Sequence, residues 1–165
     1  MRHQSISFIE EFMKIHGVPR DTLDVGSLAV DGEVVTPRPL FETYTGVDMR
    51  KGKNVDIVAN SHDLVKTFGR SKFDCVICFD TLEHDDKFWL TLDQMKKVLR
   101  RGGWMLIGIP SGRAGEHMQP NDYWRFMPNS IEVLFDGFTD VFRISEKLEE
   151  FDIFDEIYAW GRKPL

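Results

Sequence analysis

Residues 73–79 read FDCVICF, and DTLEH follows them at residues 80–84. A short run of mostly apolar residues, rich in aromatic and β-branched types and ended by polar residues, predicts a strand that is buried on both faces of a sheet. Such strands belong to parallel sheets that carry helices on both faces. The chain on either side of this strand should therefore alternate between helices and strands.

That alternation runs along the whole chain. Apolar residues at helical spacing predict helices at 6–16, 61–69, 88–99 and 129–135, and apolar runs predict strands at 22–26, 44–48, 55–59, 104–109, 139–145 and 153–162. The last two strands lie too close in sequence for a parallel crossover, so they should form an antiparallel hairpin. Pro37 and Pro39 leave room for only a short helix after the first strand. The expected fold is α/β, an open and mostly parallel sheet with an antiparallel edge, in a single domain over residues 1–165.

The composition excludes several classes of protein. The 165 residues contain 21 Lys and Arg against 27 Asp and Glu, and this net charge of −6 argues against binding to nucleic-acid phosphates. No apolar run approaches the roughly 20 residues that span a bilayer, and Glu10 and Glu11 interrupt the region where a signal peptide has its apolar core. Two cysteines are too few for a disulfide scaffold. We expect a cytoplasmic monomer or homodimer that binds neither nucleic acid nor membranes.

Ligands of open α/β sheets bind at the carboxyl ends of the strands, so the residues that follow the strands are candidates for a binding site. Gly26 ends the first strand and lets the backbone approach a ligand, and Asp48 ends the second with a carboxylate that can accept two ribose hydroxyls. This pair fits a nicotinamide dinucleotide or S-adenosylmethionine. Leu28, Ala29 and Val30 stand where a dinucleotide site needs further glycines for its pyrophosphate, which favours S-adenosylmethionine.

Four blocks of sequence then follow in a familiar order: LDVGS at 23–27, YTGVDMR at 44–50, FDCVICFDTLEH at 73–84 and MKKVLRRGGWMLIGIP at 95–110, with a fifth, NDYWRFMP, at 121–128. In these blocks the chain resembles the class I S-adenosylmethionine-dependent methyltransferases, specifically the type 11 methyltransferase family. The resemblance implies the Rossmann-like methyltransferase fold, with seven strands in the order 3-2-1-4-5-7-6 and strand 7 antiparallel. The chain departs from the family at residues 24–30, where DVGSLAV replaces the usual DxGxGxG.

The resemblance also implies a cofactor site. Asp48 would bind the ribose, Met49 would pack on the adenine ring, and Asn60 would accept a hydrogen bond from the adenine amine. The full set of expected cofactor-binding residues is Asp24, Gly26, Ser27, Asp48, Met49, Asn60, Ser61, His62, Phe79 and Asp80.

The candidate catalytic residues come from two segments. His84 follows the fourth strand and is a candidate general base. The long polar and aromatic segment 111–128 follows the fifth strand and can cover an acceptor site, to which it would contribute His117 and Tyr123.

No metal is expected, for two reasons of spacing. The consecutive residues Glu83 to Asp86 do not have the spacing of ligands that converge on one ion. Cys75 and Cys78 lie three apart in a strand and face opposite sides of the sheet.

We expect an enzyme that transfers a methyl group from S-adenosylmethionine to a small molecule or a sugar, on an oxygen or a nitrogen atom. Two alternatives stay open, a protein methyltransferase and a non-catalytic cofactor-binding domain that acts through partners. A small nucleotide-binding oxidoreductase is a third and weaker alternative.

Overall fold

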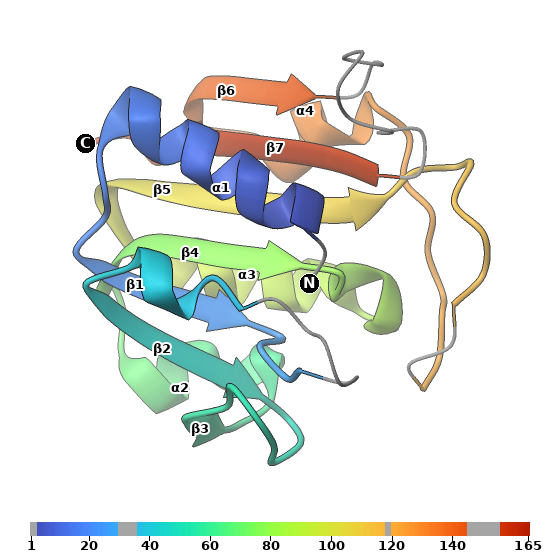
Figure 1. The fold of residues 1–165 in the computed structure, drawn as a ribbon, viewed down its shortest axis with the longest axis horizontal. Coiled ribbons are helices and arrows are strands. Elements are labelled where there is room, and N and C mark those ends of the chain that lie inside the picture. The colour runs from blue at the N-terminus through green and yellow to red at the C-terminus, as the bar shows by residue number, and fades with distance from the viewer. Residues whose placement is uncertain (1–2, 30–35, 118–119, 145–155) are drawn as a thin grey trace.

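The computed structural model describes residues 3–29, 36–117, 120–144 and 156–165. Its centre is a seven-stranded sheet in the order β3-β2-β1-β4-β5-β7-β6 (Figure 1). Five strands pair in parallel, namely β1 (Asp21–Val25), β2 (Thr43–Asp48), β3 (Ile57–Val58), β4 (Phe73–Phe79) and β5 (Leu99–Pro110). The antiparallel strand β7 (Glu156–Arg162) lies between β5 and β6 (Thr139–Ile144). The fold class, the strand order and the direction of β7 predicted from the sequence are confirmed.

The strand β4 lies near the middle of the sheet, between β1 and β5. All of its residues except Asp74 are buried, as its apolar run predicts. Successive side chains point to opposite faces, so Cys75 lies in the core on one face and Cys78 in the core on the other. Both cysteines are free thiols.

The helices divide between the two faces of the sheet (Figure 1). One face carries α1 (His3–His16), whose Phe8 and Phe12 are buried against Trp160 of β7. The other face carries α2 (Leu64–Phe68), α3 (Phe88–Val98) and α4 (Ser130–Leu134), which share a second apolar core.

Between β1 and β2, residues 36–42 form only the 3-10 turn η1 (Arg38–Leu40), as the two prolines predict. The loop between β2 and β3 covers the neighbouring sheet face instead. A Cβ on Gly46 would lie 2.1 Å from the Asn54 carbonyl oxygen, so the loop can lie this close only over a glycine. Asn54 Nδ2 donates to the Tyr44 hydroxyl at 2.8 Å, and the Arg38 guanidinium stacks 4.4 Å from the centre of the Tyr44 ring. A polar layer therefore takes the place of a helix at this position.

Some element boundaries differ from those predicted. The predicted strand 55–59 is reduced to the two residues of β3, because β3 is at the edge of the sheet and has only β2 to pair with. The predicted helix 61–69 starts as a 3-10 turn, η2 (Ser61–Asp63), before α2. The strand β5 starts five residues earlier than predicted. Residues 145 and 153–155 of the last two predicted strands lie outside the described residues.

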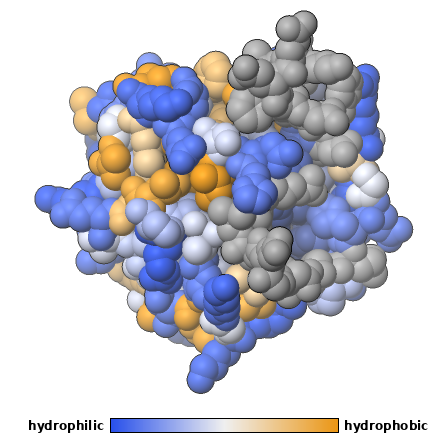
Figure 2. All heavy atoms as spheres, in the orientation of Figure 1, coloured by the Kyte–Doolittle hydropathy of each residue, from blue (hydrophilic) through white to orange (hydrophobic). Residues whose placement is uncertain are grey.

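The face that carries α1 is of mixed hydropathy, with hydrophobic residues gathered near the helix in Figure 2. Exposed apolar side chains near its end include Ile15 and Val18. Within the described part of the chain, every helix is too short or too polar to cross a membrane.

Candidate functional site

The strand order reverses between β1 and β4, and the carboxyl ends of these two strands meet there. Gly26 follows β1 with a φ of +78°, and a Cβ at this position would lie 2.1 Å from Oγ1 of Thr81, which follows β4. The glycine is therefore required by its backbone conformation and by the Thr81 side chain packed against it. Open α/β sheets bind their ligands in the crevice at this reversal point.

Asp48 and Met49 lie on the β2 side of this crevice. Asp48 Oδ1 accepts a hydrogen bond from the backbone N–H of Arg50 at 2.8 Å, and no described residue donates to Oδ2. The Met49 side chain is 67% exposed, which is unusual for a large apolar residue. A carboxylate with an oxygen free to accept hydroxyls, beside an exposed apolar surface, fits the ribose and the base of an adenosine group.

Asn60, Ser61 and His62 form the next turn, η2. Asn60 Oδ1 caps this turn by accepting from the backbone N–H of His62 at 2.8 Å, which leaves one lone pair on that oxygen for a ligand. The Ser61 hydroxyl accepts from Thr91 at 2.7 Å, and His62 Nε2 lies 2.9 Å from Asp85 Oδ2. These contacts fix the turn at the edge of the crevice.

Three residues of the expected cofactor-binding set, Asp24, Ser27 and Phe79, are buried. Asp24 is 2% exposed and accepts a hydrogen bond from the Tyr44 hydroxyl, and burial raises the pKa of its carboxyl to about 7. The hydroxyl of Ser27 is buried with no partner among the described residues. Phe79 packs against Phe8 of α1, because strand alternation directs it to that face.

Asp80 lies directly after β4 with a φ of +49°, and its backbone N–H donates to the Gly108 carbonyl at 3.1 Å. Near it, the Tyr158 hydroxyl donates to the buried Glu156 carboxylate and lies 3.4 Å from the Ser5 hydroxyl. Burial and the Glu156 charge raise the pKa of Tyr158. Sequence reasoning missed Glu156 and Tyr158, because an antiparallel strand brings its first residues, not its last, to the carboxyl ends of its neighbours.

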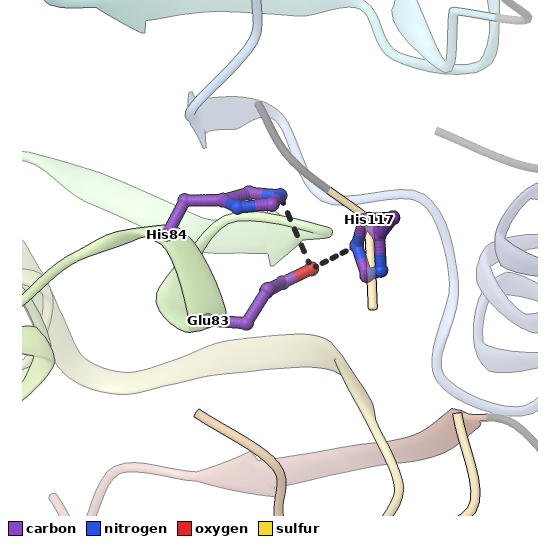
Figure 3. A group of neighbouring side chains, drawn as sticks. All are labelled: Glu83, His84 and His117. Carbon is purple, nitrogen blue, oxygen red and sulfur yellow. Dashed lines mark hydrogen bonds and ion pairs between the residues drawn. The ribbon is translucent and has the colours of Figure 1, made fainter. Parts of the chain in front are cut away.

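The structure brings together two of the three candidate catalytic residues, His84 and His117. Both lie against Glu83, which was not among the predicted site residues. His84 ends the turn η3 (Leu82–His84), and His117 comes from the loop between β5 and α4. Both rings point toward the Glu83 carboxylate (Figure 3). Glu83 Oε1 lies 3.3 Å from His117 Nε2 and 3.7 Å from His84 Nε2. The hydrogen bond to Glu83 raises the pKa of His117.

Tyr123, the third candidate, contributes its backbone to this site. Its N–H donates to the Glu83 carbonyl oxygen at 2.8 Å, while its side chain is 49% exposed. The structure therefore places the Tyr123 ring largely in solvent.

The loop that carries His117 is anchored at both ends. The Gly112 N–H donates to the Phe126 carbonyl at 2.9 Å, and the Phe126 N–H donates to the Pro110 carbonyl at 3.0 Å. Arg125 donates to the Asp122 carboxylate and to the Gly115 carbonyl within the loop. The loop extends beyond the carboxyl ends of the parallel strands (Figure 1), so it borders the crevice.

A family model described as a methyltransferase domain matches residues 1–136. An S-adenosylmethionine-dependent methyltransferase from Archaeoglobus fulgidus is 14% identical to this chain in sequence, and its structure matches with a TM-score of 0.69. The match covers 99% of this chain and 95% of that one. The 1,6-didemethyltoxoflavin-N1-methyltransferase of Burkholderia thailandensis is 16% identical with a TM-score of 0.70, over 99% of this chain and 78% of that one. The N-methyltransferase NodS of Bradyrhizobium japonicum, solved with S-adenosylhomocysteine, is 15% identical with a TM-score of 0.66, over 98% and 87%. No curated protein matches the chain in sequence.

At these identities the solved structures share the fold with this chain, while the family model covers most of its length. The resemblance of the sequence blocks to class I methyltransferases, with S-adenosylmethionine as cofactor, is confirmed at the level of the family. The chain belongs to the methyltransferase-domain family of class I, S-adenosylmethionine-dependent enzymes.

Proposed function

We propose that this enzyme transfers a methyl group from S-adenosylmethionine to an oxygen or nitrogen atom of a small molecule or a sugar. The observation that carries the proposal is the pair formed by the Asp48 carboxylate and the exposed Met49 side chain, at the carboxyl end of β2. Asp48 would accept the ribose hydroxyls, Met49 would cover the adenine ring, and Asn60 would bond the adenine edge. Asp80 lies on the other side of the reversal point, where the methionine part would extend.

The bound donor supplies a methyl group that is activated by a positively charged sulfur. Direct displacement from such a donor needs the acceptor atom in line with the methyl group and little water nearby, so orientation is the main contribution of the protein. The anchored loop 111–126, with His117, and the turn that carries His84 border the acceptor side of the crevice. A histidine here can take the proton of an acceptor hydroxyl or ammonium group.

A small acceptor is supported by two observations. The net charge of −6 disfavours polyanionic acceptors such as nucleic acids. The structurally similar enzyme of Burkholderia thailandensis was solved with 1,6-didemethyltoxoflavin, which is a small molecule.

Two observations favour a second candidate function, a non-catalytic domain that acts through partners. The Thr81 side chain occupies the space beside Gly26 that a ligand could approach. The bulky loop after β1 also lacks the repeated glycines of the family pattern.

Calorimetric titration with S-adenosylhomocysteine, and with a nicotinamide dinucleotide as a comparison, separates these functions. We expect S-adenosylhomocysteine to bind and the dinucleotide not to bind. Asp48→Ala should weaken the binding of S-adenosylhomocysteine at least about tenfold, because hydrogen bonds to a charged group contribute about 1.5–3 kcal/mol. Asp86→Ala, at an exposed aspartate outside the crevice, is the matched control and should bind as the wild type does. Absence of binding at millimolar concentration would exclude the catalytic proposal, and normal binding by Asp48→Ala would exclude the ribose assignment.

A further inference from the structure

Glu83, His84 and His117 offer one ligand atom each within 4.8 Å of one another. Glu83 and His84 come from the turn η3 after β4, and His117 comes from the loop after β5, 33 positions further along the chain (Figure 3). We call these three residues the Glu-His-His cluster. Two imidazoles and one carboxylate are the ligand set of many open transition-metal sites.

The spacing of the cluster matches that of ligands around one ion. Zinc bonds to nitrogen and oxygen are about 2.0–2.2 Å long, so two ligands at a tetrahedral angle lie about 3.4 Å apart. Glu83 Oε1 lies 3.3 Å from His117 Nε2 and 3.7 Å from His84 Nε2. The three side chains therefore need little movement to bind one ion.

The burial of Glu83 is a second and independent observation. Glu83 is 0% exposed, and its Oε2 has no hydrogen-bond partner among the described residues. A buried carboxylate without donors or a cation is strongly unfavourable. Arg125, a basic side chain of the same loop, is paired with Asp122.

The orientation of both histidines also fits a metal. His84 Nδ1 lies 2.5 Å from the Asn121 carbonyl oxygen, and His117 Nδ1 lies 3.4 Å from the Gly115 carbonyl oxygen. A carbonyl can only accept, so each Nδ1 donates its proton there, and Nε2 is the nitrogen that each ring turns toward Glu83. With Nδ1 bonded to a carbonyl, Nε2 is the ring nitrogen available to a metal ion. This use of backbone carbonyls to orient histidines is typical of metal sites.

We propose that the Glu-His-His cluster binds one divalent transition-metal ion, such as Zn²⁺, whose open coordination positions hold an oxygen of the methyl acceptor. This proposal replaces the expectation of a metal-free enzyme, and its second part rests on the proposed methyltransferase function. The cluster lies on the β4–β5 side of the reversal point, and the donor-binding residues Asp48 and Met49 lie on the β2 side. An acceptor held by the metal would thus lie across the reversal point from the donor.

The chemistry would favour an acceptor hydroxyl. A divalent ion makes a bound hydroxyl easier to deprotonate, and the released proton would pass to water. The acceptor oxygen would then form a bond to the methyl carbon while the carbon–sulfur bond breaks and its electron pair stays on sulfur. The products are a methyl ether and a neutral thioether, so the charges and atoms balance.

The test uses tag-free full-length protein stripped with a chelator. Zn²⁺ and Mg²⁺ are titrated in competition with a chromophoric chelator, and Co²⁺ is added separately to record its visible absorption. We expect one Zn²⁺ to bind per chain and Mg²⁺ not to compete, because Mg²⁺ prefers all-oxygen sites. The visible absorption of bound Co²⁺ should be that of an ion with a low coordination number. His117→Ala and Glu83→Gln should each weaken the binding of Zn²⁺ at least about tenfold. His16→Gln, at the opposite end of the sheet, is the matched control and should bind as the wild type does.

Protein stability separates loss of the site from loss of the fold. Without metal, Glu83→Gln removes a buried charge and should unfold at a higher temperature than the wild type, yet Zn²⁺ should raise its unfolding temperature much less. No Zn²⁺ binding by the wild type, or equal binding by the wild type and both cluster variants, would overturn the metal site. In that case the cluster is an ion pair between Glu83 and a protonated histidine.

The acceptor part has its own measurement. Acetohydroxamate, a small ligand with two oxygen donors, should change the Co²⁺ spectrum of the wild type. An unchanged spectrum would mean that the coordination is closed and would overturn the acceptor part. Binding of S-adenosylhomocysteine is measured on the metal-free protein, so failure of the metal site and failure of the proposed function give different results.

Discussion

The buried carboxyl of Asp24 should make the stability of the protein fall as the pH rises. Asp24 is 2% exposed, and burial raises its pKa from 3.8 to about 7, although the hydrogen bond from Tyr44 partly opposes this rise. The folded state therefore holds a proton between about pH 4 and pH 7 that the unfolded state has lost. The free energy of unfolding must decrease with pH across this range.

The size of the effect follows from the two pKa values. A pKa raised from 3.8 to about 7 corresponds to a loss of up to about 4 kcal/mol above pH 7, compared with pH values below 4. Asp24→Asn removes the titration and keeps an oxygen that can accept from the Tyr44 hydroxyl. The variant should therefore compare best with the wild type below about pH 4, and its stability relative to the wild type should increase steadily up to about pH 7.

Urea unfolding followed by circular dichroism, from about pH 4 to about pH 8, measures the difference. Asp86→Asn is the control, because it removes an exposed carboxyl and should follow the wild type at every pH. If Asp24→Asn loses as much stability with rising pH as the wild type, the proton is not held on Asp24 and the reasoning is refuted.

Two further variants test the packing around the site and beneath α1. Gly26→Ala should lower stability by about 1–3 kcal/mol in thermal unfolding, because the new Cβ meets Thr81 at a positive φ, and a second change, Thr81→Ala, should recover part of the loss. If Gly26→Ala unfolds as the wild type does, the close contact with Thr81 is wrong. Phe8→Ala should cost about 3–5 kcal/mol in urea unfolding, because Phe8 is buried against Tyr158 and Trp160, and a loss below about 1 kcal/mol would show that α1 does not depend on this contact.

The fold was predictable because its strands are local apolar runs. The run at 73–79 needs no distant information to be a buried strand, and Pro37 and Pro39 indicate that only a short helix can follow the first strand. The length of β3 was not predictable in this way. It depends on how much of β2 is available for pairing, and a sequence pattern does not contain this information.

The position of Asp48 at the carboxyl end of β2 was predictable for a similar reason. Asp48 ends a strand, and the position of a strand end follows from the fold. The direction of the Phe79 side chain follows from alternation along β4. Phe79 lies on the same face as Cys75 and Ile77, in the core under α1.

The Glu-His-His cluster could not be predicted from spacing. Glu83 and His84 are adjacent, and His117 lies on a loop whose path is set by the pairing of Phe126 with Pro110 and Gly112. A search for ligands at helical spacing finds nothing here, because the convergence is tertiary.

The unusual loop after β1 and the missing helix have one structural explanation. Leu28 packs so closely on Gly52 that a Cβ there would lie 2.3 Å from Leu28 Cδ1, and the Ala29 N–H donates to the Lys53 carbonyl at 3.1 Å. The loop after β1 therefore packs on the β2–β3 loop, whose Asn54 covers the sheet face beside η1. A glycine at position 28 would lose the side-chain part of this packing. The departure from the family pattern at Leu28 thus has a structural reason, its packing on the β2–β3 loop, and by itself it does not indicate a loss of catalysis.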